Sequence, residues 1–284
     1  MVDQTSLDLD RKQLRLLVQR TLVEDLADAG DVTSDSILDS GRPGSAALLA
    51  KSELVLAGLP VADAVFRQMD SELDIEWTVS DGARLAPGDT VGRVSGMVHS
   101  IMAAERVALN FVQHLSGVAT LTSKFVGICR PHGVQLLCTR KTIPGLRAVQ
   151  RYAVGVGGGN LHRAGLYDAI LIKTNHCKLV GSIEEAVRRA KKRSDAEVEV
   201  EVTNLQELHQ AARAGAERVL LDNADVDVIA EAVEAKPKSL FLEVSGGIDL
   251  DTAASIAACR PDAISVGRIT HSAPAADLAL HVNL

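Results

Sequence analysis

Aromatic side chains are scarce in this sequence of 284 residues, which contains one Trp, two Tyr and four Phe. Hydrophobic residues nevertheless make up 46% of the chain, so the core must be packed mainly from Ala, Val, Leu and Ile. Such packing is common where helices cover a parallel sheet. The length allows one large domain or two smaller ones with a proper core, which indicates a globular protein.

Cysteine is scarce as well. The four cysteines, Cys129, Cys138, Cys177 and Cys259, fall at irregular spacings with no Cys-x-x-Cys pair. This spacing provides neither a zinc-binding pattern nor the disulfide framework of a small secreted protein. We therefore predict that the cysteines are reduced.

Long apolar runs and an excess of basic residues are both missing. No run approaches membrane-spanning length, and the first twenty residues mix Asp, Arg, Lys and Gln with the leucines, unlike a signal peptide. We therefore predict a cytoplasmic protein. The formal net charge of -7 argues against nucleic-acid and anionic-membrane partners, because neither is attracted to an acidic surface.

One part of the chain is locally basic. Residues 138–142, 157–163 and 172–176 together carry two Arg, two Lys, two His and a triple glycine. Arginine matches carboxylates and phosphates bidentately, and lysine adds a mobile point charge. A solvated basic surface is the alternative reading. Because the first and last of these groups directly follow apolar runs typical of buried strands, we favour a site for a polyanion.

The first part of the chain predicts a small α+β unit. Apolar residues at spacings of three and four indicate a helix over residues 10–27, and Pro60 suits the first turn of a helix over 60–68. Residues 97–126 read as helical, with a break expected at Ser116-Gly117. Strands are expected at 46–50, 54–57 and 73–79.

From residue 134 onward, apolar runs alternate with helical segments. Strands are expected at 134–138, 169–173, 197–202, 218–221, 240–244 and 263–266, and helices at 183–192, 204–214, 226–235 and 252–258. This βα repeat predicts a parallel sheet, and its regularity favours closure into a barrel.

The reacting groups of such a barrel project from the C-terminal ends of its strands. Every predicted strand ends in polar residues, namely Thr139-Arg140-Lys141, Lys173, Glu201, Asp222-Asn223, Ser245-Gly246-Gly247 and Gly267-Arg268. The last two groups contain glycine, which lets backbone N–H groups approach a phosphate. We therefore expect a phosphate site at these loops.

The strand at 197–202 carries three glutamates at every second position, so they share one face. Helices should cover the valine face, which turns the glutamates inward. For Glu197 and Glu199, a position on the solvent-exposed face of an edge strand is an equally good interpretation. Glu201 is the functional candidate, and with Asp222 it could hold Mg²⁺, a hard cation that prefers carboxylates and phosphate oxygens.

Taken together, these segments resemble the quinolinate phosphoribosyltransferase family, also called nicotinate-nucleotide pyrophosphorylase (carboxylating). The resemblance is carried in order by Ala104-Glu105-Arg106, residues 114–120, Thr139-Arg140-Lys141-Thr142, Gly157-Gly158-Gly159, His162-Arg163, residues 165–168, Leu171-Ile172-Lys173, Glu199-Val200-Glu201, Leu221-Asp222-Asn223, Ser245-Gly246-Gly247 and Thr270-His271-Ser272.

The resemblance implies an α/β protein of two domains. An N-terminal α+β sandwich-like domain over residues 1–115 would be joined by the tail 274–284. An incomplete, seven-stranded parallel α/β barrel would follow over residues 116–273. The resemblance also implies a homodimer, possibly a higher oligomer, in which Arg106 reaches the partner's site.

The resemblance further implies a reaction and a role for each site residue. Phosphoribosyl would pass from phosphoribosyl pyrophosphate to the ring nitrogen of quinolinate, with decarboxylation, as a step of NAD biosynthesis. The catalytic residues would be Lys141, Lys173, Glu201 and Asp222, and Mg²⁺ would be held by Glu201 and Asp222. The substrate would be bound by Arg106, Arg140, His162, Arg163 and Lys173, and the phosphate by Ser245, Gly246, Gly247, Gly267 and His271.

Two positions depart from the family pattern. Leu161 stands where the family usually has Asn, and Thr174 stands where it usually has Asp. The alternatives are therefore a related phosphoribosyltransferase for another aromatic acid, a silent ligand-binding homologue, and a barrel aldolase with Lys173 as nucleophile. Inward carboxylates argue against simple anion binding.

Overall fold

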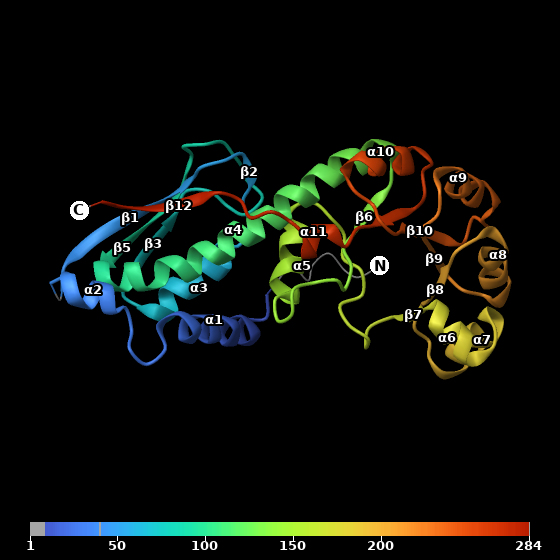
Figure 1. The fold of residues 1–284 in the computed structure, drawn as a ribbon, viewed down its shortest axis with the longest axis horizontal. Coiled ribbons are helices and arrows are strands. Elements are labelled where there is room, and N and C mark those ends of the chain that lie inside the picture. The colour runs from blue at the N-terminus through green and yellow to red at the C-terminus, as the bar shows by residue number, and fades with distance from the viewer. Residues whose placement is uncertain (1–8, 40, 284) are drawn as a thin grey trace. The chain divides into compact units, whose positions relative to one another are not determined.

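The computed structural model describes residues 9–39 and 41–283, and these form two compact units (Figure 1). The barrel unit consists of Lys124–Thr142 and Gly159–Ser272. The N-terminal unit consists of residues 9–123, Ile143–Gly158 and residues 273–283. The predicted domain boundary between 115 and 116 stays a prediction, and the ends of the predicted ranges, 1–8 and 284, lie outside the described residues.

The N-terminal unit is built on a four-stranded antiparallel sheet in the order β12-β1-β5-β3. Its strands are β1 (Pro43–Ala50), β3 (Asp74–Trp77), β5 (Thr90–Met97) and β12 (Leu278–Asn283), while β2 (Leu54–Val55) pairs with β4 (Arg84–Leu85). The helices are α1 (Arg11–Leu26), α2 (Val32–Ile37), α3 (Leu59–Met69), α5 (Arg147–Val156) and most of α4 (Val98–Cys129). The sequence did not predict β5 or β12.

Helix α4 runs without interruption through Ser116-Gly117, so the predicted break there is wrong. Both residues lie close to other chain segments, and a larger side chain would not fit there. The Ser116 hydroxyl donates to the carbonyl of Ala57 and accepts from its N–H. A Cβ on Gly117 would overlap the carbonyl oxygen of Pro274. The glycine therefore serves close approach of two chain segments, not helix termination.

The barrel unit contains a parallel sheet in the order β6-β11-β10-β9-β8-β7. The strands are β6 (Gln135–Leu137), β7 (Ile170–Ile172), β8 (Val198–Val202), β9 (Arg218–Asp222), β10 (Phe241–Ser245) and β11 (Ala263–Ser265). Within the described residues the sheet has six strands, and a single parallel bridge from Leu137 to Asn160 extends it beyond β6. The predicted parallel α/β architecture is confirmed, with six strands in the described sheet where seven were expected.

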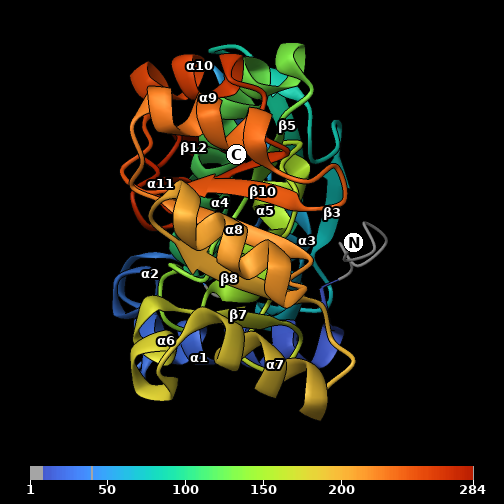
Figure 2. The ribbon, with the colours of Figure 1, turned by 90° about the vertical axis from the view of Figure 1, so that its right-hand side faces the viewer.

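Helices cover the outer face of this sheet, as Figure 2 shows for α7, α8 and α9. The helices of this unit are α6 (Thr174–Val180), α7 (Ile183–Arg193), α8 (Leu205–Ala214), α9 (Val226–Ala235), α10 (Leu250–Ala258) and α11 (Arg268–His271). Ser182, Asn204 and Asp249 begin three of them, and each side chain accepts a hydrogen bond from the first helical turn. The strands therefore have their outer side chains under helices and their inner ones free for a site.

Strand β8 follows this division. Val198, Val200 and Val202 are fully buried, and Glu199 is 4% exposed. Since β8 lies between β7 and β9, the edge-strand alternative for Glu199 is wrong, whereas Glu197 precedes the strand and is exposed.

None of the helices in the described part of the chain is both long and apolar enough to cross a membrane.

Candidate active site

Lys173 and Glu201 meet at the C-terminal ends of the neighbouring strands β7 and β8. The Lys173 Nζ lies 2.5 Å from Glu201 Oε2. The other oxygen, Oε1, accepts from the hydroxyl of Thr174 at 2.9 Å and from its N–H at 3.2 Å. Burial raises the pKa of Glu201, but the hydrogen bonds from Lys173 and Thr174 outweigh it, so the pKa lies below its ordinary value. Glu201 is thus held as a carboxylate.

Lys141 lies beside the loop that follows β11. A Cβ on Gly267 would lie 2.9 Å from Lys141 Cδ and 3.2 Å from His271 Nε2. The hydroxyl of Thr270 donates to the Lys141 carbonyl at 2.7 Å, which ties the two loops together. The structure therefore brings together three residues predicted for pyrophosphate and phosphate binding, and glycine is the residue that leaves room between them.

Asp222 and the glycine pair after β10 form a third group. Asp222 and Ser245 are partners across β9 and β10, and the N–H of Asn223 donates to the Ser245 carbonyl at 2.8 Å. Gly246 has φ +105°, and any Cβ there would overlap Asn223. Only glycine suits this close turn, so the loop takes the backbone form expected of a phosphate cradle.

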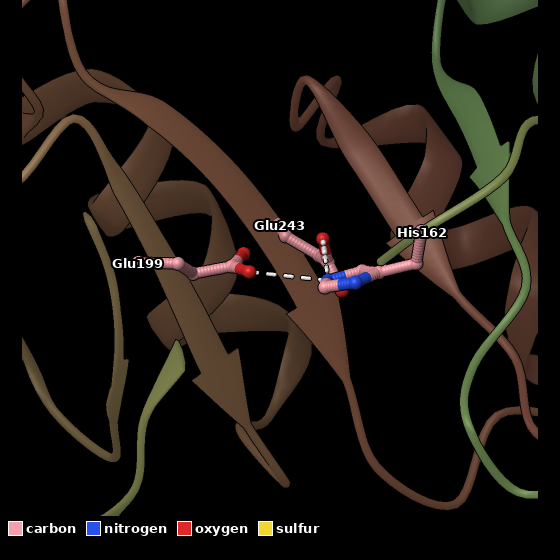
Figure 3. A group of neighbouring side chains, drawn as sticks. All are labelled: His162, Glu199 and Glu243. Atoms are coloured by element: carbon pink, nitrogen blue, oxygen red, sulfur yellow. Dashed lines mark ion pairs between the residues drawn. The ribbon is translucent and has the colours of Figure 1, made fainter. Parts of the chain in front are cut away.

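A fourth group lies deeper, on the inner face of the sheet. His162 Nε2 is 3.1 Å from Glu199 Oε2 and 3.4 Å from Glu243 Oε2, and the three side chains point toward one another (Figure 3). Arg218 completes the group, with its Nη2 3.2 Å from Glu243 Oε2 and its Nε 3.5 Å from Glu199 Oε1. Two carboxylates thus share one guanidinium and one imidazole.

The protonation of His162 is set by opposing effects. Burial lowers the pKa of the ring, but hydrogen bonds to Glu199 and Glu243 and their charges raise it to about 9. The N–H of Arg163, however, donates to His162 Nδ1 at 2.7 Å and needs a lone pair there. In this geometry Nε2, which faces both carboxylates, carries a proton, and Nδ1 keeps the lone pair that accepts from Arg163.

Arg140 and Arg163 add two positive charges in the same unit. Arg163 is 8% exposed, and its Nη1 donates to the Ala169 carbonyl at 3.2 Å. Burial and the charge of Arg140 lower the pKa of Arg163. Two guanidiniums that repel one another inside a protein suit an anion with more than one negative charge.

Asp222 and Glu201, the two predicted Mg²⁺ ligands, differ in how far their oxygens are already engaged by the protein. Asp222 is half-buried, and its Oδ2 accepts from the Asn223 side chain at 2.8 Å. Glu201 is held through both oxygens by Lys173 and Thr174. Both are hard oxygen donors of the type that Mg²⁺ prefers, but Asp222 has fewer ties to its own chain.

The remaining predicted residue, Arg106, belongs to the N-terminal unit. Its side chain is exposed on α4. Its predicted role in the partner's site stays a prediction.

Arg218, Glu243 and the hydrogen bonds of Thr174 were not predicted from the sequence. A single charged residue inside an apolar strand, as in Phe241-Leu-Glu-Val-Ser245, was the available signal for Glu243, because burying an isolated charge is unfavourable unless it has a partner. Nothing in the sequence revealed that its partners come from β9 and from the segment after Asn160.

Comparison with known proteins gives a match along almost the whole chain. The family model described as quinolinate phosphoribosyl transferase, N-terminal domain, matches residues 31–116, and the corresponding C-terminal domain matches residues 118–281.

Individual proteins are similar over the same length. The probable nicotinate-nucleotide pyrophosphorylase (carboxylating) of Bacillus subtilis (strain 168) is 34% identical over 278 residues, which cover 97% of this chain and 96% of that protein. The chloroplastic enzyme of that name from Oryza sativa subsp. japonica is 37% identical and covers 95% and 78%. The solved nicotinate-nucleotide pyrophosphorylase of Francisella tularensis has a TM-score of 0.94 at 42% identity and covers 97% and 98%.

Proposed function

The chain belongs to the quinolinate phosphoribosyl transferase family, and from that premise we propose that it makes nicotinate mononucleotide. It transfers phosphoribosyl from phosphoribosyl pyrophosphate to the ring nitrogen of quinolinate and releases pyrophosphate and CO₂. It is therefore a pentosyltransferase of NAD biosynthesis. The similarity extends over both domains, so it does not favour a relative for another aromatic acid or a silent homologue.

One observation carries the assignment to these residues. At the C-terminal edge of one parallel sheet, Lys173 directly after β7 meets Glu201 of β8, and Lys141 lies against Gly267 and His271 after β6 and β11. The first pair suits the ribose and the aromatic acid, and the second group suits the phosphates. An acceptor and a phosphorylated donor can thus lie side by side at this edge.

We assign the recognition of quinolinate to the cations. Its two adjacent carboxylates match Arg140, Arg163 and Lys173, with His162 beside them, and Arg106 of the partner subunit would complete the pocket. The support is the charge repulsion between Arg140 and Arg163, which a dianion relieves. Fixing both carboxylates orients the ring nitrogen toward C1 of the ribose, and such positioning supplies much of the rate.

Glycosyl transfer breaks the bond from C1 to the pyrophosphate oxygen and forms a bond from C1 to the ring nitrogen. Positive charge builds on the ribose as pyrophosphate leaves, and Glu201 and Asp222 offset that charge. Lys141 offsets the charge on the leaving group. The loops of Ser245, Gly246, Gly247, Gly267 and His271 hold the 5′-phosphate.

Decarboxylation then breaks the bond from ring carbon 2 to its carboxylate. The electron pair stays on carbon 2, next to the positively charged ring nitrogen, and takes a proton. We propose that Lys173 or a water molecule gives this proton, since the Lys173 ammonium is a proton donor held beside Glu201 at the proposed acceptor position.

We further propose that Mg²⁺ is held by Glu201 and Asp222, and that the protein is a homodimer. When bound, the ion would offset charge on the pyrophosphate oxygens. The exposed position of Arg106 on α4 supports a role toward a second subunit. The cytoplasmic location stays a prediction, because the rice relative is named as chloroplastic.

The first experiment is incubation of the purified protein with quinolinate, phosphoribosyl pyrophosphate and Mg²⁺, following nicotinate mononucleotide and pyrophosphate together. We expect both products in equal amounts, and at least a ~100-fold lower rate for Lys141→Ala and Glu201→Ala. Lys192→Ala, on the exposed face of α7, is the matched control. Binding of phosphoribosyl pyrophosphate without product would refute quinolinate as the acceptor.

A further inference from the structure

Three charged residues of the sheet have no part in the function proposed above, yet they surround one of its residues. Glu199 of β8 is the direct partner of Arg218 of β9, and Arg218 is the partner of Phe241 of β10. Glu243 lies two residues beyond Phe241 and hence on the same face. Strand pairing alone therefore places these side chains together on the inner face.

These side chains are linked and nearly removed from solvent. Glu199 is 4% exposed and Glu243 is fully buried. The Arg218 guanidinium lies 3.9 Å above the centre of the Phe241 ring while it reaches both carboxylates. Removing a carboxylate from water is unfavourable unless its charge is compensated, and one guanidinium compensates one of two charges. A second donor is needed.

His162 is that donor. Its Nε2 faces Glu199 and Glu243, and its Nδ1 accepts the N–H of Arg163 (Figure 3). The ring is therefore held at both nitrogens. On one side lies a sheet of three paired strands, and on the other lies the backbone of Arg163, whose guanidinium is proposed to bind substrate.

We propose that Glu199, Glu243 and Arg218 form a positioning platform that fixes the ring of His162 and, through it, the backbone of Arg163 in the orientation that receives an aromatic dicarboxylate. The inference rests on the proposed function, because it assigns the platform to the acceptor side of the same site. A cation fixed before binding loses less conformational freedom when substrate arrives, so the platform acts on acceptor affinity.

A metal ion is the competing occupant of this cluster. One donor atom each from His162, Glu199 and Glu243 lies within 4.8 Å of the others, a spacing that suits a transition metal. Arg218 argues against it, because its guanidinium already lies beside both carboxylates and would repel a cation. Metal content is therefore one outcome of the test.

The test compares Glu199→Gln and Glu243→Gln, which keep the shape of the side chain and remove its charge, with Glu197→Gln as an exposed control. We expect the KM for quinolinate to rise about tenfold in the first two. The kcat and the KM for phosphoribosyl pyrophosphate should stay within about threefold of the parent, and the control should match the parent. An unchanged KM for quinolinate, or an equal effect on both substrates, would overturn the platform.

A double-mutant cycle shows whether the effect passes through His162. In a His162→Ala background, Glu243→Gln should raise the KM for quinolinate by no more than about twofold, because the connection is already broken. Fully additive effects would mean that Glu243 acts by another route and would overturn the proposal.

Two measurements do not depend on turnover. Nitrogen NMR of the parent should show His162 protonated at Nε2, and a bare Nε2 would overturn the platform even if the variants fail to fold. Calorimetry should show quinolinate bound about tenfold more weakly by Glu243→Gln. If calorimetry shows this tenfold difference but the parent makes no product, the proposed function is refuted and the platform is supported. If the parent holds stoichiometric zinc or manganese that Glu243→Gln has lost, the platform is overturned.

Discussion

Thr174 shows how one residue can change the character of a site. Its hydroxyl and its N–H both donate to Glu201 Oε1, while Lys173 holds Oε2. An acidic residue at this position, the usual one by family resemblance, would repel Glu201 instead. Thr174 in place of an acidic residue thus means one negative charge fewer beside the proposed ribose position, and its hydroxyl is a donor that fixes the carboxylate.

Replacing Thr174 by Val keeps the shape of the side chain and removes the donor. We expect kcat/KM at neutral pH to fall about tenfold, since a hydrogen bond to a charged group contributes about 1.5–3 kcal/mol. Thr174→Ser retains the hydroxyl and should stay within about twofold of the parent. Steady-state kinetics of the two variants checks this, and equal losses in both would show that the methyl group matters more than the hydroxyl.

A second residue-scale prediction concerns stability. The Tyr152 hydroxyl donates to Asp81 Oδ2 at 2.6 Å, and Asp81 also accepts the N–H groups of Gly58 and Leu59 at the start of α3. Burial raises the pKa of Asp81, and the bond from Tyr152 opposes that rise. The hydroxyl therefore stabilises the ionised form of Asp81.

Tyr152→Phe should lower the free energy of unfolding by about 1.5–3 kcal/mol at pH 7. Without the Tyr152 hydroxyl the pKa of Asp81 in the folded protein rises further above its value in the unfolded chain. The variant therefore loses free energy of unfolding as the pH rises through this pKa and Asp81 ionises, but not in acid, where Asp81 is protonated. The difference in free energy of unfolding between parent and variant should therefore shrink in acid. Urea titrations at several pH values measure this. Tyr167→Phe is the control, since that side chain is 85% exposed. A deficit independent of pH would contradict the assignment.

At this scale the sequence was informative where a residue lies at the end of a strand. The proximity of Lys173 and Glu201 could be predicted because strand ends gather at one edge and alternate residues share a face. Glu243 and Arg218 could not, because their pairing depends on the register between β8, β9 and β10, which no local pattern records. Arg106 entered by resemblance alone, since an exposed arginine on a helix has no distinguishing pattern.

Among the elements, α4 departs most from its sequence signal. Ser116-Gly117 reads as a break, yet the helix continues because tertiary contacts compensate for the low helix propensity of glycine. Helix α6 was missed for the opposite reason: its seven residues are too few to show a helical period. Long periodic helices such as α7 and α9 agree closely with their predicted ranges.

Two glycines of α4 allow a matched prediction. A Cβ on Gly117 would overlap Pro274, whereas a Cβ on Gly127 would meet no atom within 4 Å. Gly117→Ala should therefore lower the free energy of unfolding by about 2 kcal/mol or more. Gly127→Ala should raise it by up to about 1 kcal/mol, because alanine is the better helix former. Thermal melting of both checks this, and similar effects at the two positions would refute the packing role of Gly117.

At the scale of the whole molecule, each active site of the proposed dimer would contain residues from both subunits. If Arg106 serves the partner's site while Lys141 serves its own, then Arg106→Ala and Lys141→Ala damage different subunits. A mixed dimer would then hold one intact site and one site that carries both substitutions.

Each variant alone should be nearly inactive, and mixing equal amounts after dissociation and reassociation should restore about a quarter of the parent activity. This value follows because half of the random dimers are mixed and each has one working site. A mixture of Lys141→Ala and Glu201→Ala is the control and should restore nothing, since both residues belong to the barrel unit. Activity no higher than that of the separate variants would place Arg106 outside the partner's site.

The order of strands in the N-terminal sheet also affects how the protein is made. β12, which pairs with β1 along six residue positions, is the last strand of the described chain. A ribosome therefore completes the sequence of the barrel before it supplies this strand. Throughout synthesis the outer edge of β1 lacks its native partner, and an open edge can pair with other chains. The newborn protein is therefore most prone to aggregation until β12 emerges, and a product truncated or stalled before β12 would retain that open edge.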